Sequence, residues 1–404
     1  MTAVFMGIIQ KFISIVLSAL MLLGFNVSLP QKEHDDWNTN YKYVMVHGLM
    51  GWGKYAFYYD LMPYWGMSTG DMLERLRYEG FECYAASVAP TDSAWDRACE
   101  LYAQLAGTVV DYGAEHSAKH NHERYGTDYT DNKLFEGEWN EIEKINLVGH
   151  SFGGATVRIF AHIMENGSEA EREYTTDGTL SPFFEGGKGD WIYSVTTLAA
   201  PHNGTTAYES DGETAPDEDA VEESKGVLAG LGEIGEKIIG NVVGMIMPSG
   251  GERPEDDRAS YDMTIDNALV LNENIDTLEN VYYFSYAAQA TYEDENGYHV
   301  PDMKEMENMF VSSSVEMGKL TGVTEGGYII DEKWLPNDGL VNTYSALAPF
   351  NAPQVEYAEG NVKPGQWNIM QIYYGNHMIF MGGLTVLRDM TDFFVDAFNI
   401  VNKL

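Results

Sequence analysis

The sequence predicts an α/β fold in which a mainly parallel central sheet is covered by helices on both faces. Short apolar runs alternate along the chain with segments whose apolar residues recur at helical spacing. Such alternation is typical of parallel sheets, because each crossover between parallel strands needs a helix-length connection. One apolar run also stops at a sharp G-H-S-F-G-G turn, directly before a segment with helical spacing.

The expected elements follow in order along the 404 residues. Strands are expected at 41–48, 83–90, 143–151, 191–201, 281–289 and 367–374. Helices are expected at 70–81, 96–105, 155–164 and 384–401. A polar, histidine-bearing loop is expected at 111–135, where no apolar period is visible.

The N-terminal segment differs in kind from the rest. Lys11 is its only charged residue before position 30, and an apolar run follows at 12–25. That run is shorter than the roughly 20 residues of a membrane span, and it fits the apolar region of a signal peptide. We expect residues 1–28 to be a signal peptide for secretion, with an N-terminal membrane anchor as the alternative. Residues 41–404 are expected to form a single domain.

A lid insertion is expected at about 205–260. It begins with an acidic run at 209–224, which reads as a solvated loop. The segment 226–247 then has apolar residues at helical spacing, interrupted by glycines that weaken a helix by about 1 kcal/mol each. The alternative for this segment is an ordinary helix that packs on the core.

Composition excludes several classes of protein. The chain has 24 Lys and Arg against 62 Asp and Glu, a net charge of −38, which opposes binding to nucleic acid. Aromatic residues make up 13%, too many for a disordered acidic chain. Two cysteines, Cys83 and Cys99, rule out a disulfide scaffold, and we expect two buried thiols. Nothing indicates a protein partner.

Ser151 is the candidate nucleophile. It occupies the centre of G-H-S-F-G, a G-x-S-x-G pattern between an expected strand and an expected helix. The flanking glycines permit a tight turn that exposes the hydroxyl. The N–H of Phe152 at the start of the helix then becomes a candidate oxyanion donor. The alternative is a serine that only caps a helix.

A serine nucleophile needs a base and an orienting acid, which follow it in the order acid, then histidine. His377 is the candidate base because it follows the last expected strand. Asp338 is the candidate acid because it lies in a turn upstream, in W-L-P-N-D-G. The N–H of Leu49, in the glycine-rich H-G-L-M-G-W-G loop after the first strand, is the second candidate oxyanion donor.

The longer motifs carry a family resemblance. They are HGLMGWG, YWGMSTGD, DSAWDRACELYAQL, TVVDYGAEHSAKHNHERYG, GHSFGG, SVTTLAAPHNGTT and EKWLPNDGLVNTYS. From about Tyr43 to about His377 the chain resembles the zinc-binding true lipases of bacteria, which have the α/β-hydrolase fold. The resemblance implies hydrolysis of acylglycerol esters at an oil–water interface, with Ser151, Asp338 and His377 as the triad. It implies no organic cofactor.

The resemblance also implies a structural zinc ion, held in a small extra region by two Asp and two His. Asp71, His116 and His122 match three of these ligands. The fourth lies in a tryptophan-containing loop of the family that this chain lacks between Met247 and Tyr261. A site with three ligands, an absent site, or histidines in an ordinary polar loop therefore stay open, since structural zinc normally takes four ligands.

A calcium site is not expected. The family binds calcium partly through acidic residues just after its catalytic histidine, where this chain has Ile379 and Leu384. Two rival functions remain. One is a carboxylesterase or phospholipase that prefers shorter or soluble esters, and the other is a non-catalytic lipid-binding protein on the same scaffold.

Overall fold

The structure is a computed structural model that describes residues 31–209 and 253–404. The expected signal peptide, nearly all of the acidic run and the amphipathic segment at 226–247 lie outside these residues. Within the described part of the chain, no helix is long and apolar enough to cross a membrane.

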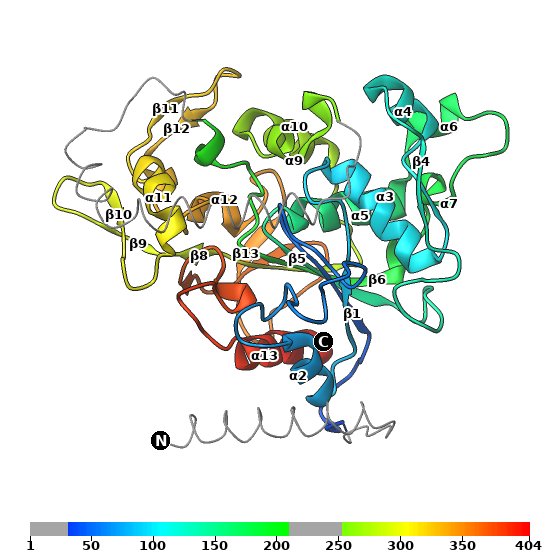
Figure 1. Ribbon diagram of the computed structural model, residues 1–404, viewed down its shortest axis with the longest axis horizontal. Coiled ribbons are helices and arrows are strands. Elements are labelled where there is room, and N and C mark those ends of the chain that lie inside the picture. The colour runs from blue at the N-terminus through cyan, green and yellow to red at the C-terminus, as the bar shows by residue number, and fades with distance from the viewer. Residues whose placement is uncertain (1–30, 210–252) are drawn as a thin grey trace.

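A seven-stranded sheet forms the centre of the molecule (Figure 1). Its strands, in spatial order, are β13 (Gln354–Glu356), β14 (Trp367–Ile369), β7 (Tyr282–Tyr286), β6 (Ile192–Leu198), β5 (Ile145–His150), β1 (Lys42–Val46) and β2 (Cys83–Ala86). Every neighbouring pair is parallel. The predicted fold class is therefore confirmed, and it is that of the α/β hydrolases.

Helices cover both faces of this sheet (Figure 1). On one face lie α3 (Ala94–Ala106) and α5 (Gly153–Asn166), and on the other lie α2 (Met72–Tyr78) and α13 (Thr391–Asn402). Successive strand residues point to opposite faces, so Val44 and Val46 pack in the α3/α5 core while Tyr43 and Met45 pack in the α2/α13 core. Two apolar layers thus fix β1 from both sides.

Local sequence explains where α3 begins and ends. Ser93 Oγ accepts the N–H of Asp96 at 3.3 Å as an N-cap, and Gly107 ends the helix with φ of 68°. Between these caps, Ala98, Leu101 and Leu105 are buried.

The remaining helices and strands are short and lie outside the central sheet. The helices are α6 (Glu169–Tyr174), α7 (Pro182–Glu185), α9 (Ala259–Asp262), α10 (Ile265–Asn274), α11 (Val311–Met317) and α12 (Thr343–Leu347). The short strands are β8 (Ala288–Gln289), β9 (Thr291–Glu293), β10 (His299–Pro301), β11 (Gly322–Val323) and β12 (Ile329–Ile330). Three 3₁₀ turns matter below: η3 (Glu255–Asp257), η4 (Asn308–Phe310) and η6 (Ile379–Met381).

Three expected elements differ from the structure. The segment expected as one loop at 111–135 contains α4 (Ala114–His120) between the paired strands β3 (Val109–Asp111) and β4 (Tyr125–Asp128). An Arg124–Asp111 ion pair at 2.8 Å fastens this hairpin. The strand expected at 367–374 is two strands, because β15 (Tyr373–Tyr374) leaves the sheet to pair with β8. The last helix begins at residue 391 instead of 384.

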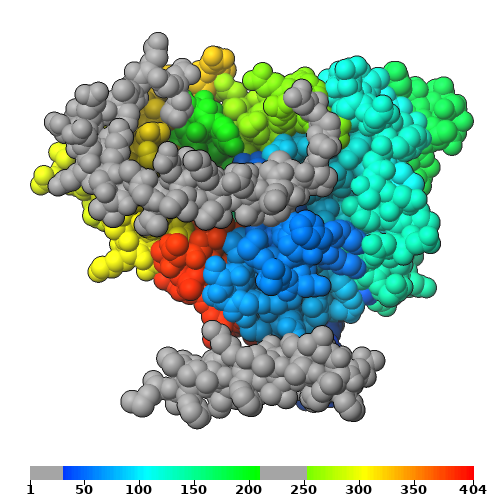
Figure 2. Space-filling model, viewed as in Figure 1, coloured from blue at the N-terminus to red at the C-terminus, as the bar shows by residue number. Residues whose placement is uncertain are grey.

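Segments from the early and late parts of the described chain lie side by side. In Figure 2 a blue surface adjoins a red surface. Arg75 Nε donates to Thr391 Oγ1 at 2.7 Å, and the N–H of Gly66 donates to the carbonyl of Met381 at 3.1 Å. Cys83 and Cys99 are both free and buried, as expected.

Candidate active site and metal cluster

Ser151 lies at the sharp turn between β5 and α5. Its φ is 54°, a left-handed conformation that costs a non-glycine residue on the order of 1–3 kcal/mol. The turn is held by the Ser151 N–H, which donates to the carbonyl of Leu198 at 2.8 Å. A Cβ on Gly149 would lie 2.4 Å from the carbonyl oxygen of Gly153, so this turn requires glycine there. The strand–turn–helix context expected for the G-x-S-x-G pattern is therefore present.

Asp338 and His377 are in direct contact. His377 Nδ1 lies 2.8 Å from Asp338 Oδ2, and the His377 N–H donates to the Asp338 carbonyl at 2.9 Å. Both side chains are buried, with 1% and 3% of their surfaces exposed. Asp338 Oδ1 accepts the N–H groups of Leu340 and Val341 at 3.0 and 2.8 Å, which fixes the second carboxylate oxygen. The structure therefore brings this predicted pair together.

His150 connects this pair to the turn that carries Ser151. The His150 and His377 rings lie 5.0 Å apart, centroid to centroid. His150 Nε2 donates to the main-chain carbonyl of His377 at 2.9 Å, since a carbonyl can only accept. In neutral imidazole the other nitrogen then accepts, and His150 Nδ1 lies 2.7 Å from the Tyr64 hydroxyl.

The same relay reaches the first glycine loop. The Tyr64 hydroxyl accepts the N–H of Gly48 at 3.0 Å while it donates to His150. Burial, together with the neighbouring His377, holds the pKa of His150 well below its usual value of 6.5, so His150 stays neutral and keeps this pattern of donors. Gly48, Tyr64, His150 and His377 thus form one hydrogen-bonded chain.

The loop after β1 packs directly against the candidate nucleophile. A Cβ on Gly48 would lie 2.6 Å from Ser151 Cβ and 3.1 Å from Ser151 Oγ, so only glycine fits. The next residue is Leu49, whose N–H was expected to be an oxyanion donor together with the N–H of Phe152. In the described part of the chain, neither N–H donates a hydrogen bond to protein. No acceptor among the described residues therefore competes for either N–H.

A second cluster lies away from this turn. Asp96, His116, His122 and Asp257 each direct one ligand atom into a space where all four atoms lie within 4.8 Å of one another. His116 Nε2 lies 3.1 Å from Asp96 Oδ1 and 3.3 Å from Asp257 Oδ1, and His122 Nε2 lies 3.3 Å from Asp257 Oδ2. Two carboxylates and two imidazoles form a donor set that suits tetrahedral zinc.

The donors fit a metal because their side chains are buried and point into one space, although Asp96 Oδ2 also forms an ion pair with Arg253 at 2.7 Å. Asp257 is fully buried, and neither of its carboxylate oxygens makes a hydrogen bond with the described residues; the same is true of Nε2 in both histidines. His122 Nδ1 donates to the carbonyl of Glu123 at 2.9 Å, which leaves the Nε2 lone pair free for a ligand bond. Two buried carboxylates whose ligand atoms lie within 4.8 Å of each other repel, and a bound cation would offset that cost.

Asp71 is a correction to the expected ligand set. It is the N-cap of α2, where its carboxylate accepts the N–H of Glu74 at 3.2 Å, and it is not a member of the cluster. The aspartates are instead Asp96, in the D-S-A-W-D-R-A-C-E stretch, and Asp257, in the segment between Met247 and Tyr261 where the sequence predicts no ligand. No local pattern singles out Asp96, because Glu100 lies one turn further along the same helix face.

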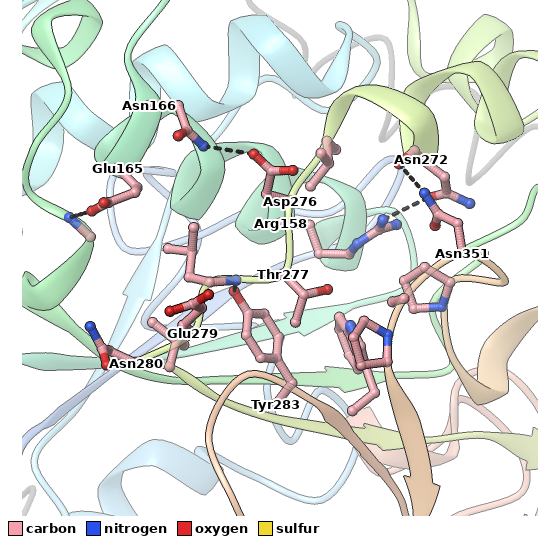
Figure 3. A pocket seen from close by; sticks show the side chains of 18 of the residues that line it. Arg158, Glu165, Asn166, Asn272, Asp276, Thr277, Glu279, Asn280, Tyr283 and Asn351 are labelled. Carbon is pink, nitrogen blue, oxygen red and sulfur yellow. Dashed lines mark hydrogen bonds between the residues drawn. The ribbon is translucent and has the colours of Figure 1, made fainter.

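A cavity elsewhere in the molecule is a separate feature (Figure 3). It has a volume of about 550 Å³ and lies where β6, β7 and β14 begin, whereas Ser151 lies where β5 ends. Arg158 and Asn272 face each other in it, with Arg158 NH2 2.6 Å from Asn272 Oδ1. The rim carries carboxylates that include Glu165 and Asp276. None of the predicted catalytic residues lines this cavity.

Comparisons with known proteins agree with this architecture. The family model described as "Lipase-like, C-terminal domain" matches residues 39–222 and 252–398. Lipase 2 of Staphylococcus aureus is 33% identical over 364 residues, which cover 85% of this chain and 50% of that protein. The chain spans about half the length of the curated relatives it matches.

Two solved structures are similar over nearly the whole chain. EstA from Clostridium botulinum has 33% sequence identity and a TM-score of 0.76, and the match covers 94% of this chain and 92% of that one. Staphylococcus hyicus lipase has 28% identity and a TM-score of 0.74, and the match covers 93% of this chain and 99% of that one.

Proposed function

The chain belongs to the staphylococcal-type bacterial lipase family, an α/β-hydrolase family, and we propose that it hydrolyses carboxylic esters of acylglycerols through a Ser151 acyl-enzyme. One observation carries the proposal. The buried Asp338–His377 pair is hydrogen-bonded through His150 to the turn that holds Ser151 in a left-handed conformation.

The reaction proceeds by double displacement. The Ser151 hydroxyl attacks the ester carbonyl and gives its proton to His377 Nε2, which is the basic nitrogen because Nδ1–H donates to Asp338. Asp338 stabilises the imidazolium, and the N–H groups of Leu49 and Phe152 bind the oxyanion. The imidazolium then protonates the leaving alcohol. Water, deprotonated by His377, hydrolyses the acyl-enzyme and restores Ser151.

Substrate class is tested by a chain-length series. We expect faster hydrolysis of emulsified long-chain triacylglycerol, at an oil–water interface, than of dissolved short-chain esters. The opposite preference would identify a carboxylesterase, and activity on phospholipid vesicles alone would identify a phospholipase. Absence of both ester hydrolysis and fluorophosphonate labelling would leave a non-catalytic lipid-binding protein.

A zinc ion is the cofactor that we propose for the cluster of Asp96, His116, His122 and Asp257. When bound, it would supply a structural cross-link and no catalytic step. Its ligands join α3 and the segment of α4 with the turn after it to η3, which lies far from both in sequence. We propose neither a calcium ion nor an organic cofactor, because the proposed reaction uses only side chains and backbone N–H groups.

We also propose that the protein is secreted, because its apolar run at 12–25 has the length of a signal-peptide core. N-terminal sequencing of protein from the culture medium is expected to begin near residue 28. Protein that stays in the membrane fraction with an intact N-terminus would support an anchor instead.

A further inference from the structure

Glu307 is a buried carboxylate that the proposed mechanism does not use. It precedes η4, and only 1% of its surface is exposed. Glu307 Oε1 accepts the N–H groups of Leu384 at 2.7 Å, Thr385 at 2.9 Å and Val386 at 3.1 Å. Oε2 accepts the Thr385 hydroxyl and lies 3.1 Å from the Thr385 N–H. Three consecutive amides and a hydroxyl therefore converge on one side chain.

The three N–H groups and the hydroxyl around Glu307 are all hydrogen-bond donors, which suits an anion. Among residues 31–209 and 253–404, no Lys, Arg or His forms an ion pair with Glu307, so its partners are the three amides and the Thr385 hydroxyl. A metal ion at this position would face three N–H groups, whose positive ends would repel it. The arrangement is therefore complete without a cation, and its charge-assisted hydrogen bonds are of the strong kind.

The three N–H groups that Glu307 accepts belong to the loop that follows His377 in the sequence. That loop passes through η6 and turns at Gly382 and Gly383, whose φ angles are 92° and 75°. Its apolar side packs in the α2/α13 core through Ile379. Its polar side is held by Glu307, so the backbone that follows His377 is fixed from both directions.

The segment that carries Glu307 also contacts the other half of the pair. Phe310 packs edge-on against the His377 ring at 6.5 Å between centroids. Gly339, next to Asp338, lies so close to this segment that a Cβ on it would be 2.8 Å from Met306 Sδ. Asn376 Nδ2 donates to the Glu305 carbonyl at 2.6 Å. Residues 305–310 therefore touch both the turn of Asp338 and the loop of His377.

We propose that Glu307 is a positioning residue whose carboxylate fixes the loop behind His377 and thereby holds the imidazole against Asp338. This inference rests on the proposed function, because it assigns His377 the role of base. Glu307 itself touches no reacting atom. Its effect reaches the chemistry only through the geometry of the Asp338–His377 hydrogen bond.

The test compares Glu307→Gln with Thr385→Val and a matched control. Asp266→Asn is the control. The Asp266 carboxylate also holds a loop in place, because it accepts the Gly326 N–H at 2.6 Å and the Thr324 hydroxyl at 2.5 Å. That loop carries no proposed catalytic residue. kcat and KM are measured with a dissolved ester, per site titrated with a fluorophosphonate, well below the Tm of each variant. We expect Glu307→Gln to lower kcat by at least about tenfold with KM within about twofold.

Thr385→Val leaves the Glu307 carboxylate in place and removes only the hydroxyl that donates to it. It therefore tests the effect of loop position on kcat separately from the effect of the Glu307 charge. We expect about a threefold loss of kcat in Thr385→Val and a kcat within about twofold of wild type in Asp266→Asn. Glu307→Gln with wild-type kcat overturns the proposal, as does an equal loss in Asp266→Asn. If Glu307→Gln does not fold, Thr385→Val decides, and an unchanged kcat in that variant overturns the proposal.

A ¹H NMR measurement tests the positioning role of Glu307 independently of esterase activity. The proton between His377 Nδ1 and Asp338 is expected to give a ¹H NMR signal well downfield of the amides in wild type and in Asp266→Asn. Glu307→Gln is expected to lose or broaden that signal, and an unchanged signal overturns the positioning role. Wild-type protein without esterase activity would refute the proposed function, while the NMR comparison would still decide whether Glu307 orders the pair.

Discussion

Asp338 and His377 are joined twice, once through their side chains at 2.8 Å and once through the His377 N–H and the Asp338 carbonyl at 2.9 Å. The double contact fixes both the distance and the orientation of the imidazole. It also fixes the tautomer, because Nδ1 must carry the proton that Asp338 accepts. In the proposed mechanism, Nε2 is therefore the nitrogen left to accept a proton from Ser151.

Asp338→Asn tests this tautomer directly. Asparagine can present its N–H₂ group to Nδ1 and so favour the wrong tautomer, and we expect kcat to fall by about four orders of magnitude with little change in KM. Steady-state kinetics on a dissolved ester measure the effect. A loss of less than tenfold would show that another group orients His377.

Gly48→Ala tests the contact between the first glycine loop and the nucleophile. The added Cβ would lie 2.6 Å from Ser151 Cβ, so the loop or Ser151 must move. We expect kcat/KM to fall by at least about tenfold while the Tm changes little. Gly322→Ala is the control, because a Cβ on Gly322 would meet nothing within 4 Å. Equal activity in the two variants would argue against close packing at Ser151.

The metal cluster predicts a stability effect. Protein purified without chelator is expected to contain about one zinc per chain, and His116→Ala is expected to lose it and to lower the Tm by roughly 10 °C or more. His120→Ala is the matched control, since its ring lies 4.5 Å from His116 but it is not a member of the cluster. Unchanged zinc content and Tm in His116→Ala would refute the site.

Glu100 predicts a pH dependence of stability. Burial and the nearby charge of Asp92 raise its pKa to about 8, although hydrogen bonds from the Ala89 N–H and the Tyr112 hydroxyl oppose the rise. Because the pKa is higher in the folded state than the ordinary 4.5, the contribution of Glu100 is fully present below about pH 4.5 and is lost as the pH rises toward 8.

Glu100→Gln removes that ionisation. We expect the Tm of the variant, relative to wild type, to increase steadily between pH 5 and pH 8, as measured by thermal unfolding in buffers of equal ionic strength. A difference in Tm that stays constant across this range would show that Glu100 does not titrate there.

From the sequence one could predict those features of the candidate site that depend on local turns and chain order. Gly149 and the residues around Ser151 specify a strand–turn–helix, and Asp338 and His377 follow in the order that this fold requires. The metal ligands were harder to predict from the sequence, because they come together only through tertiary contacts. Asp96 is one acidic residue within a helix, and Asp257 reaches the cluster only through the path of the chain after residue 252.

The start of α13 differs from the start that periodicity predicts. The pattern at 384–401 looks helical, but residues 384–386 lie in the loop whose N–H groups donate to the Glu307 carboxylate. The helix begins at Thr391, where the Asp389 carboxylate accepts the Thr391 N–H at 3.0 Å. Apolar periodicity reports neither of these contacts.

The most direct test of the proposed mechanism is the kcat/KM of Ser151→Ala for ester hydrolysis, compared with wild type under identical conditions. Loss of the nucleophile is expected to reduce it by about a million-fold, to the background rate of the assay. A folded Ser151→Ala protein that retains wild-type hydrolysis would show that the Ser151 hydroxyl forms no acyl-enzyme, and the proposed mechanism would be wrong.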